Sequence, residues 1–287
     1  MNTQEPKRII NTSENVDAKT VVSFGDEWTR FDQSSLTENE LLHVFSVYFR
    51  IFPWDSLPDG AEGFDMGCGS GRWARLVAPR VRKLNCIDAS AEALAVARRA
   101  LAKHDNIRFI HAPANAVPLT RASQDFGYSL GVLHHIPDTE GALRACVDLL
   151  KSGAPLLVYL YYRFDNRPRW FQRIWEASEI LRAVISRLPS RLKPLVTDVI
   201  AVLMYLPLAR FALLGERLGF EMKAMPLYYY RDKSVYTMRT DSRDRFGTPL
   251  EQRFTRSEIE AMMKRAGLAN IVFLEDEPYW CAVGRKS

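Results

Sequence analysis

A glycine-rich segment at residues 62–73, EGFDMGCGSGRW, constrains the fold of this chain more than any other stretch. A short apolar run containing Asp65 precedes three alternating glycines, and a stretch with helical spacing begins at Trp73, which predicts a strand, a tight loop and a helix. Glycine lacks a Cβ, so it adopts positive φ and lets a ligand lie against the backbone near the free N–H groups of the helix. The first candidates for a binding site are therefore Gly67, Gly69 and Gly71.

A second acidic residue, Asp88, closes the next apolar run at residues 83–87. Nucleotide-binding α/β folds use a carboxylate at this place to hold ribose hydroxyls. The glycine spacing, however, is G-x-G-x-G at residues 67–71 and differs from the G-x-G-x-x-G of dinucleotide binders. Asp65, the three glycines and Asp88 together resemble the class I S-adenosylmethionine-dependent methyltransferases.

Two later segments resemble the same family in the same order. Residues 125–138, DFGYSLGVLHHIPD, are similar to the fourth-strand segment of small-molecule enzymes related to quinone and sterol methyltransferases. Residues 150–155 resemble the turn before the fifth strand. The resemblance implies S-adenosylmethionine as cofactor and methyl transfer by in-line displacement to a small-molecule acceptor, with an oxygen as the favoured acceptor atom.

The resemblance also implies roles for single residues. Asp65 and the three glycines would lie under the methionyl end of the cofactor, and Asp88 would bind the ribose hydroxyls. Similar enzymes usually carry Asp where this chain has Pro113, so the nearby Asn115 could supply an oxygen to the adenine or merely turn the chain. The residues expected at the adenine and at the methionyl amino group are Ala89, Ser90, Ala114, Asn115 and Leu130.

Candidates on the acceptor side lie after the fourth and fifth strands, where ligands bind in this fold. His134 and His135 could act as a general base for a hydroxyl or an amine, or could only tie the loop together. We favour His135, because adjacent loop residues do not easily both point inward. The candidate substrate contacts are Tyr161, Tyr162, Tyr229 and Arg245, with packing or surface ion pairs as the alternative for each.

The alternation of strands and helices predicts an α/β fold with a Rossmann-like seven-stranded sheet, mostly parallel with an antiparallel C-terminal strand, and helices on both faces. Residues 61–162 and 251–287 would form the cofactor domain, and residues 1–60 an N-terminal extension with cap helices. Residues 163–250 lack the alternation; helices are predicted at 170–188 and 195–218, broken at prolines, as a substrate lid. The first 18 or so residues are expected to be disordered.

Net charge, cysteine content and hydropathy restrict the possible functions less than these motifs do. A net charge of +5 permits an anionic substrate or nucleic acid without demanding either. The four cysteines lack the spacing of a zinc site and predict reduced thiols in a cytoplasmic protein; no metal is expected. The apolar run Val199–Ala209 is shorter than the roughly 20 residues that span a bilayer. A signal peptide is not expected from the polar N-terminus.

Three functions remain open at this point. The favoured one is a methyltransferase of a small molecule, anionic or lipophilic, of unknown oligomeric state. An RNA methyltransferase is disfavoured, since no Asn-Pro-Pro-Tyr-type motif and no appended basic domain is present. The third is a relative that binds the cofactor without catalysis, because an intact binding loop does not prove turnover.

Overall fold

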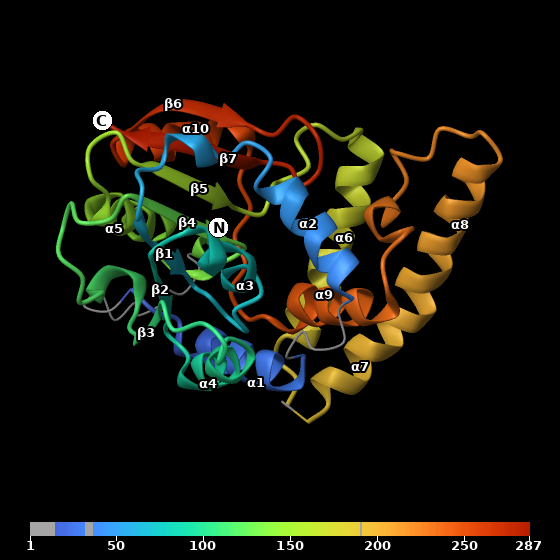
Figure 1. The fold of residues 1–287 in the computed structure, drawn as a ribbon. Coiled ribbons are helices and arrows are strands. Elements are labelled where there is room, and N and C mark those ends of the chain that lie inside the picture. Colours follow the sequence, from blue (N-terminus) through green and yellow to red (C-terminus); the bar gives the residue numbers. More distant parts are fainter. Residues whose placement is uncertain (1–14, 32–36, 190) are drawn as a thin grey trace, which may run out of the picture.

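A single seven-stranded sheet runs through the computed structural model, which describes residues 15–31, 37–189 and 191–287 (Figure 1). The expectation of disorder near the N-terminus falls mostly outside these residues. The strands are β1 (Glu62–Met66), β2 (Lys83–Asp88), β3 (Ile107–His111), β4 (Phe126–Leu130), β5 (Pro155–Tyr159), β6 (Leu268–Phe273) and β7 (Cys281–Lys286).

The strand order is β3-β2-β1-β4-β5-β7-β6, with β1 to β5 parallel and β7 antiparallel to both of its neighbours. Every residue of β4 is buried, as expected for a central parallel strand covered on both faces. The predicted α/β class and the antiparallel C-terminal strand are confirmed. The order reverses between β1 and β4, so the carboxyl ends of these strands border the crevice where this type of sheet binds ligands.

Helices cover both faces of the sheet. Two separate apolar cores result, one containing residues of α5 and α10, the other residues of α2, α3 and α4. Three of these helices have side-chain N-caps, since Ser90, Asp138 and Thr255 accept hydrogen bonds from the backbone N–H groups of their first turns. The helices are α1 (Ala18–Arg30), α2 (Glu38–Tyr48), α3 (Ala74–Val77), α4 (Ala91–Ala100), α5 (Thr139–Leu149) and α10 (Arg256–Arg265).

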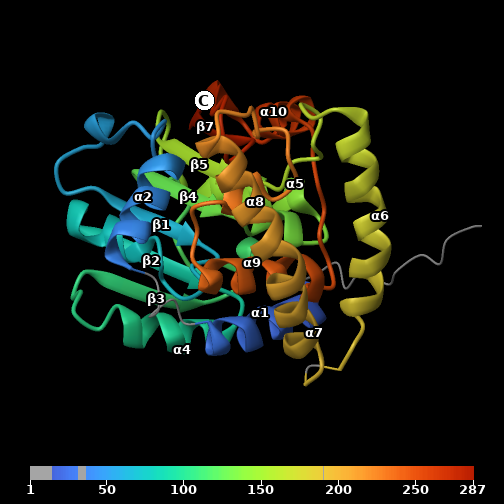
Figure 2. The same cartoon turned by 90° about the vertical axis from the view of Figure 1, so that its right-hand side faces the viewer.

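The region between β5 and α10 is helical and stands beside the carboxyl ends of the strands (Figures 1 and 2). It contains α6 (Arg169–Ile185), α7 (Lys193–Ile200), α8 (Leu206–Arg217) and α9 (Val235–Gly247). A π-helical segment, Ala201–Tyr205, joins α7 to α8. The predicted break at Pro207 is wrong, because this proline occupies the first turn of α8 and the helix runs continuously from Lys193 to Arg217.

Helix α9 is absent from the sequence prediction, yet it is the centre of this region. It packs against α6, α7 and α1. Arg243 of α9 is almost fully buried and pairs with Asp26 of α1 at 2.8 Å, and the Ser23 hydroxyl of α1 donates to the carbonyl of Gly247. Helix α1 therefore connects the helical region to the sheet domain, where it packs on α4.

Candidate functional site

Two cavities lie next to each other at the carboxyl ends of β1, β2, β4 and β5. The smaller, of about 130 Å³, surrounds the glycine loop, and we call it the loop cavity. The larger, of about 440 Å³, lies between the sheet and α6, α8 and α9, and we call it the tyrosine cavity. Nine tyrosines line the larger one: Tyr48, Tyr159, Tyr161, Tyr162, Tyr205, Tyr228, Tyr229, Tyr230 and Tyr279.

The glycine loop has the predicted backbone conformation. Gly67, Gly69 and Gly71 have φ values of +77°, +53° and +81°. A Cβ on Gly67 would lie 2.3 Å from Val132, and one on Gly69 would lie 2.9 Å from the indole of Trp28. Gly67 and Gly69 line the loop cavity, whereas Gly71 faces the helix side, where a Cβ would meet Leu101 at 2.6 Å. The first two glycines thus shape the cavity, and the third allows the helix to pack.

The carboxylate of Asp88 lies beside this loop. Its Oδ2 accepts a hydrogen bond from the Gly69 N–H at 2.9 Å, and its Oδ1 accepts one from the Ser90 N–H at 2.8 Å. Burial raises the pKa of Asp88, and these two hydrogen bonds oppose the shift. Asp88, Ala89 and Ser90 all line the loop cavity. The residues predicted to contact ribose and adenine therefore face a cavity.

Asp65 lies at the end of β1, behind the glycine loop, and is 1% exposed. Burial raises its pKa to about 8, and the nearby hydroxyl of Tyr128 opposes this shift. Among the described residues, the Asp65 Oδ2 atom has no hydrogen-bond partner. An unpartnered buried carboxyl oxygen is costly unless a donor reaches it, so Asp65 fits a cationic or N–H-bearing part of a ligand.

The wall expected to contact adenine is small and apolar. Ala89, Ala112, Ala114 and Ile136 line this part of the loop cavity. Asn115 stands in the turn Ala114–Ala116, and within the described part of the chain it is not among the lining residues. Small flat walls of this kind leave room for a stacked ring.

Helix α1 forms the roof over the loop. Phe24 and Trp28 of this helix line both cavities, and Trp28 lies against Gly69. The ring of Phe24 meets His135 edge-on with centroids 4.8 Å apart.

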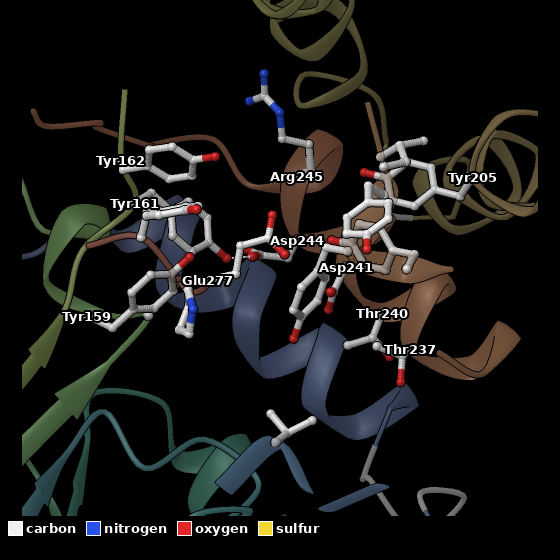
Figure 3. A pocket seen from close by; sticks show the side chains of 18 of the residues that line it. Tyr159, Tyr161, Tyr162, Tyr205, Thr237, Thr240, Asp241, Asp244, Arg245 and Glu277 are labelled. Carbon is white, nitrogen blue, oxygen red and sulfur yellow. Dashed lines mark hydrogen bonds between the residues drawn. The ribbon is translucent and has the colours of Figure 1, made fainter. Parts of the chain in front are cut away.

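Two carboxylates of α9, Asp241 and Asp244, face the tyrosine cavity (Figure 3). They stand one helical turn apart, so both point to the same side. Burial raises the pKa of Asp241 to about 6, with Arg72 and Tyr230 opposing the shift. Figure 3 shows Tyr159, Tyr161 and Tyr162 on one side of these acids and Tyr205 on the other. Sequence reasoning missed both, because no helix was predicted there.

Asp244 belongs to a polar chain that leads to His135. It is hydrogen-bonded to the Tyr161 hydroxyl, and its Oδ1 lies 3.7 Å from His135 Nε2. His135 Nδ1 lies 2.7 Å from the carbonyl of Leu250. Because a carbonyl only accepts, Nδ1 carries a proton and Nε2 faces the carboxylate. Burial raises the pKa of Asp244, and the nearby His135 opposes that shift.

The two neighbouring histidines occupy different environments. His135 lines the loop cavity, whereas His134 is fully buried and stacks on Tyr161 with ring centroids 3.9 Å apart. Burial lowers the pKa of His134 well below its usual value. The backbone N–H of Tyr161 donates to His134 Nδ1 at 3.4 Å, so this side chain has the contacts of a packing residue.

Two arginines that line the tyrosine cavity have different neighbours: one is paired with carboxylates and the other stacks on an aromatic ring. Arg245, a predicted substrate contact, is bound by Glu179 and, at 2.9 Å, by Glu251. Arg72, which was not predicted, stacks on Trp73 at 4.3 Å and lines both cavities. Of the remaining predicted contacts, Tyr161, Tyr162 and Tyr229 all line the larger cavity.

The two cavities meet along one wall. The residues that line both are Phe24, Trp28, Arg72, Trp73, Leu130 and Gly131. Leu130, where the methionyl amino group was expected, ends β4, and Gly131 follows it. A molecule in the loop cavity therefore has a face toward the tyrosine cavity at this wall.

Comparison with known proteins agrees with this geometry. Residues 64–158 match the family described as Methyltransferase domain. The ubiquinone biosynthesis O-methyltransferase of Sodalis glossinidius is 32% identical over 132 residues, covering 44% of this chain and 50% of that protein. The 2-phytyl-1,4-naphtoquinone methyltransferase of Thermosynechococcus vestitus is 36% identical over 132 residues, covering 42% and 58%. The chain thus spans about half the length of these curated relatives.

A solved structure extends the comparison of the fold. A methyltransferase-type chain from a complex with a methyltransferase activator of Haloferax volcanii aligns with a TM-score of 0.54. The alignment covers 91% of this chain and 96% of that one at 14% identity, so the similarity concerns the fold.

The sheet order, the glycine loop and the two acids at its edges define a Rossmann-like methyltransferase domain. Residues 64–158 of the chain thus carry a methyltransferase domain, and the chain resembles the class I S-adenosylmethionine-dependent methyltransferases that act on small molecules.

Proposed function

We propose that this protein transfers a methyl group from S-adenosylmethionine to an oxygen of a small lipophilic molecule held in the tyrosine cavity. The observation that carries the proposal is the wall of six residues shared by the two cavities. Methyl transfer requires donor and acceptor atoms in line at about 3 Å with water excluded. Adjoining cavities with an aromatic wall between sheet and helices meet that requirement.

The loop cavity suits the cofactor by the chemistry of its donors. Asp88 would hold the ribose hydroxyls and Arg72 the carboxylate, since both line this cavity. Asp65, which is not among the lining residues described, would serve the methionyl ammonium from behind the glycine loop through its unpartnered oxygen. The cofactor supplies an electrophilic methyl group on a sulfonium. The walls at Ala89 and Ala114 would border the adenine.

The tyrosine cavity suits an apolar ring-bearing acceptor. Phe171, Trp175, Leu208 and Met225 add apolar surface to the nine tyrosines. The named relatives act in ubiquinone biosynthesis and on a naphthoquinone. We take from them the class of acceptor only, a phenol-like or quinol-like hydroxyl on a lipophilic molecule. The region 163–250 would act as the lid that confers specificity.

A hydroxyl acceptor must lose a proton as the methyl group arrives. Asp241, with a pKa of about 6, is mostly ionised near neutral pH and faces the cavity, so it can accept that proton. Asp244 offers a second route, because the proton can pass through it to His135. His135 thus remains a candidate base, acting from the cofactor side of the wall.

An amine acceptor is the second candidate, and the buried acids favour it. Glu27 is 1% exposed, lines the tyrosine cavity, and its Oε2 has no partner among the described residues. Asp241 among several tyrosine rings would attract an ammonium group by charge and by cation–π contact. Burial raises the pKa of Glu27 well above its ordinary value, so Glu27 would contribute a hydrogen-bonding oxygen. Mass spectrometry of the methylated product distinguishes an N-methyl from an O-methyl compound.

The test is turnover with labelled cofactor and separate panels of lipophilic phenols, amines and transfer RNA. We expect labelled product with the phenols and calorimetric binding of S-adenosylhomocysteine. Binding without transfer to any acceptor would favour the non-catalytic relative, and transfer to RNA would overturn the small-molecule assignment. The buried free thiols are compatible with the cytoplasm as the site of the reaction.

A further inference from the structure

Large apolar side chains are exposed together on the helical region. Of the 19 exposed large hydrophobic residues described, 15 lie between residues 170 and 220, on α6 and along the helix Lys193–Arg217 and its two ends. In Figure 2, α7 and α8 face the viewer and α6 stands beside them at the right, so both helices lie at the surface of the helical region. An exposed apolar surface of this kind marks a site of association.

The helix from Lys193 to Arg217 is apolar on both of its faces. Its inner face packs against the protein through Ile200, Tyr205 and Ala209, which belong to a small apolar core with α9. Its outer face repeats exposed apolar residues at helical spacing: Leu195, Val199, Leu203, Phe211, Leu214 and Leu218. The most apolar 18-residue window of this 25-residue helix has a mean hydropathy of 1.7 and is only 33% buried. A surface helix in water normally presents polar residues outward, so the fold alone does not account for this face.

The tyrosine cavity reaches this surface. Ile174 of α6 and Met204 before α8 are both lining residues of the cavity and exposed side chains. The wall of the cavity therefore includes one side chain from the exposed surface of each helix.

The charges around the apolar face are mainly basic. Residues 163–223 contain eleven Lys and Arg and six Asp and Glu, an excess equal to the net charge of the whole chain. Exposed arginines lie on α6 at Arg173, just after α6 at Arg187, and near the two ends of the long helix at Arg191 and Arg217. Long basic side chains beside an apolar stripe suit a surface of anionic lipid, whose headgroups take the charge while the acyl region takes the apolar groups.

We infer that this outer face, formed by α6 and the helix Lys193–Arg217, binds the surface of an anionic lipid bilayer. The helix lies along the interface and does not cross it, because its inner face is packed on the protein and Asp198 forms a paired ion contact with Arg239. A second copy of the chain is disfavoured as occupant, since two such faces would bring like charges together.

The test is co-sedimentation of the full chain with vesicles of phosphatidylcholine, with and without phosphatidylglycerol. We expect binding to the anionic vesicles that weakens as salt is raised. The double variant Leu203→Glu and Phe211→Glu should lower partition into the vesicles about tenfold or more, because two apolar side chains that would enter the lipid are lost. Neither residue lines the loop cavity or the tyrosine cavity, so S-adenosylhomocysteine binding should be unchanged.

The matched control is Val272→Glu, a 52% exposed apolar residue on β6, which should leave vesicle binding intact. A second variant, Arg173→Glu with Arg217→Glu, tests the charge and should abolish the preference for anionic lipid. Absence of vesicle binding by the wild-type chain overturns the inference. So does a self-association, measured by sedimentation equilibrium, that the double variant abolishes while vesicles remain unbound.

Discussion

At the scale of single residues, Asp88 has the most defined role, since its two oxygens fix the glycine loop to the start of α4. We expect Asp88→Ala to weaken binding of S-adenosylhomocysteine by roughly 2 to 4 kcal/mol, because charge-assisted hydrogen bonds are lost. Titration calorimetry measures this. The exposed Asp59→Ala serves as control, and unchanged affinity of the Asp88 variant would contradict the ribose assignment.

Asp65 should make stability depend on pH in an uncommon direction. Its pKa in the folded protein is about 8 against an ordinary 3.8, so the folded state holds the proton to higher pH than the unfolded state does. The free energy of unfolding from this group therefore falls as pH rises from about 4 to about 8. Asp65→Asn should flatten that part of the profile by a few kcal/mol, measured by urea unfolding at a series of pH values. The same slope in wild type and variant would refute the argument; Asp59→Asn is the control.

Asp241 should set the acid limb of activity. With a pKa of about 6, its ionised form grows as pH rises through 6, so kcat/KM should increase there and level off above. Asp241→Asn should remove the limb and lower turnover about 100-fold, with the exposed Asp232→Asn as control. An intact limb in Asp241→Asn that disappears in His135→Gln would show that the proton leaves through Asp244 instead.

Much of the cofactor wall was accessible from sequence because it is local. Gly67 and Gly69 are needed for the conformation of the loop, and Asp88 stands at the end of β2. A glycine spacing and an acidic residue after an apolar run can both be recognised in the sequence. Arg72 and Glu27 were missed for the opposite reason. Glu27 is buried on α1 and faces the tyrosine cavity, and Arg72 lines both cavities. Such positions depend on contacts between elements far apart in sequence, which leave no local pattern.

At the scale of elements, α10 shows how far local patterns reach. The predicted capping box is present, with Thr255 and Glu258 bonding each other's backbone. Thr255→Ala should lower the free energy of unfolding by about 1 kcal/mol, measured by urea denaturation. Ser257→Ala changes a residue of the same first turn that has no capping role, so it should lower the free energy of unfolding far less. Equal effects from both would argue against the cap as the cause.

Helix α9 shows where local patterns fail. Its buried residues include Thr240, Ser242 and Arg243 besides Met238 and Phe246, so its inner face is half polar. An apolar stripe at helical spacing is the main sequence evidence for a helix, and here that stripe is missing. The only local indication is Ser234, which caps the helix by accepting from the Thr237 N–H. The candidate acids of the acceptor site lie on this helix, so they were not predicted as site residues either.

At the scale of the whole molecule, α1 joins the two parts. It lines both cavities, packs on α4 and pairs with α9 through Asp26 and Arg243. A ligand in the loop cavity should therefore stabilise sheet domain and helical region together. At 100 times its Kd, S-adenosylhomocysteine should add about 2.7 kcal/mol, roughly 5 to 10 °C in Tm.

Differential scanning calorimetry measures this shift. A single transition that moves as a unit is expected, and Asp88→Ala at the same ligand concentration should show a smaller shift. Two transitions, of which only one responds, would show that α1 does not couple the two parts.

The wall shared by the two cavities has a consequence for how this enzyme can diversify. A change at Trp28 or Leu130 that admits a bulkier acceptor also alters the surface that meets the donor, so each gain in scope there is opposed by a weaker hold on the donor. Related enzymes that adopt new acceptors should therefore differ in sequence at the part of the tyrosine cavity around Met225 and Leu208. The residues of the wall shared by the two cavities should change little.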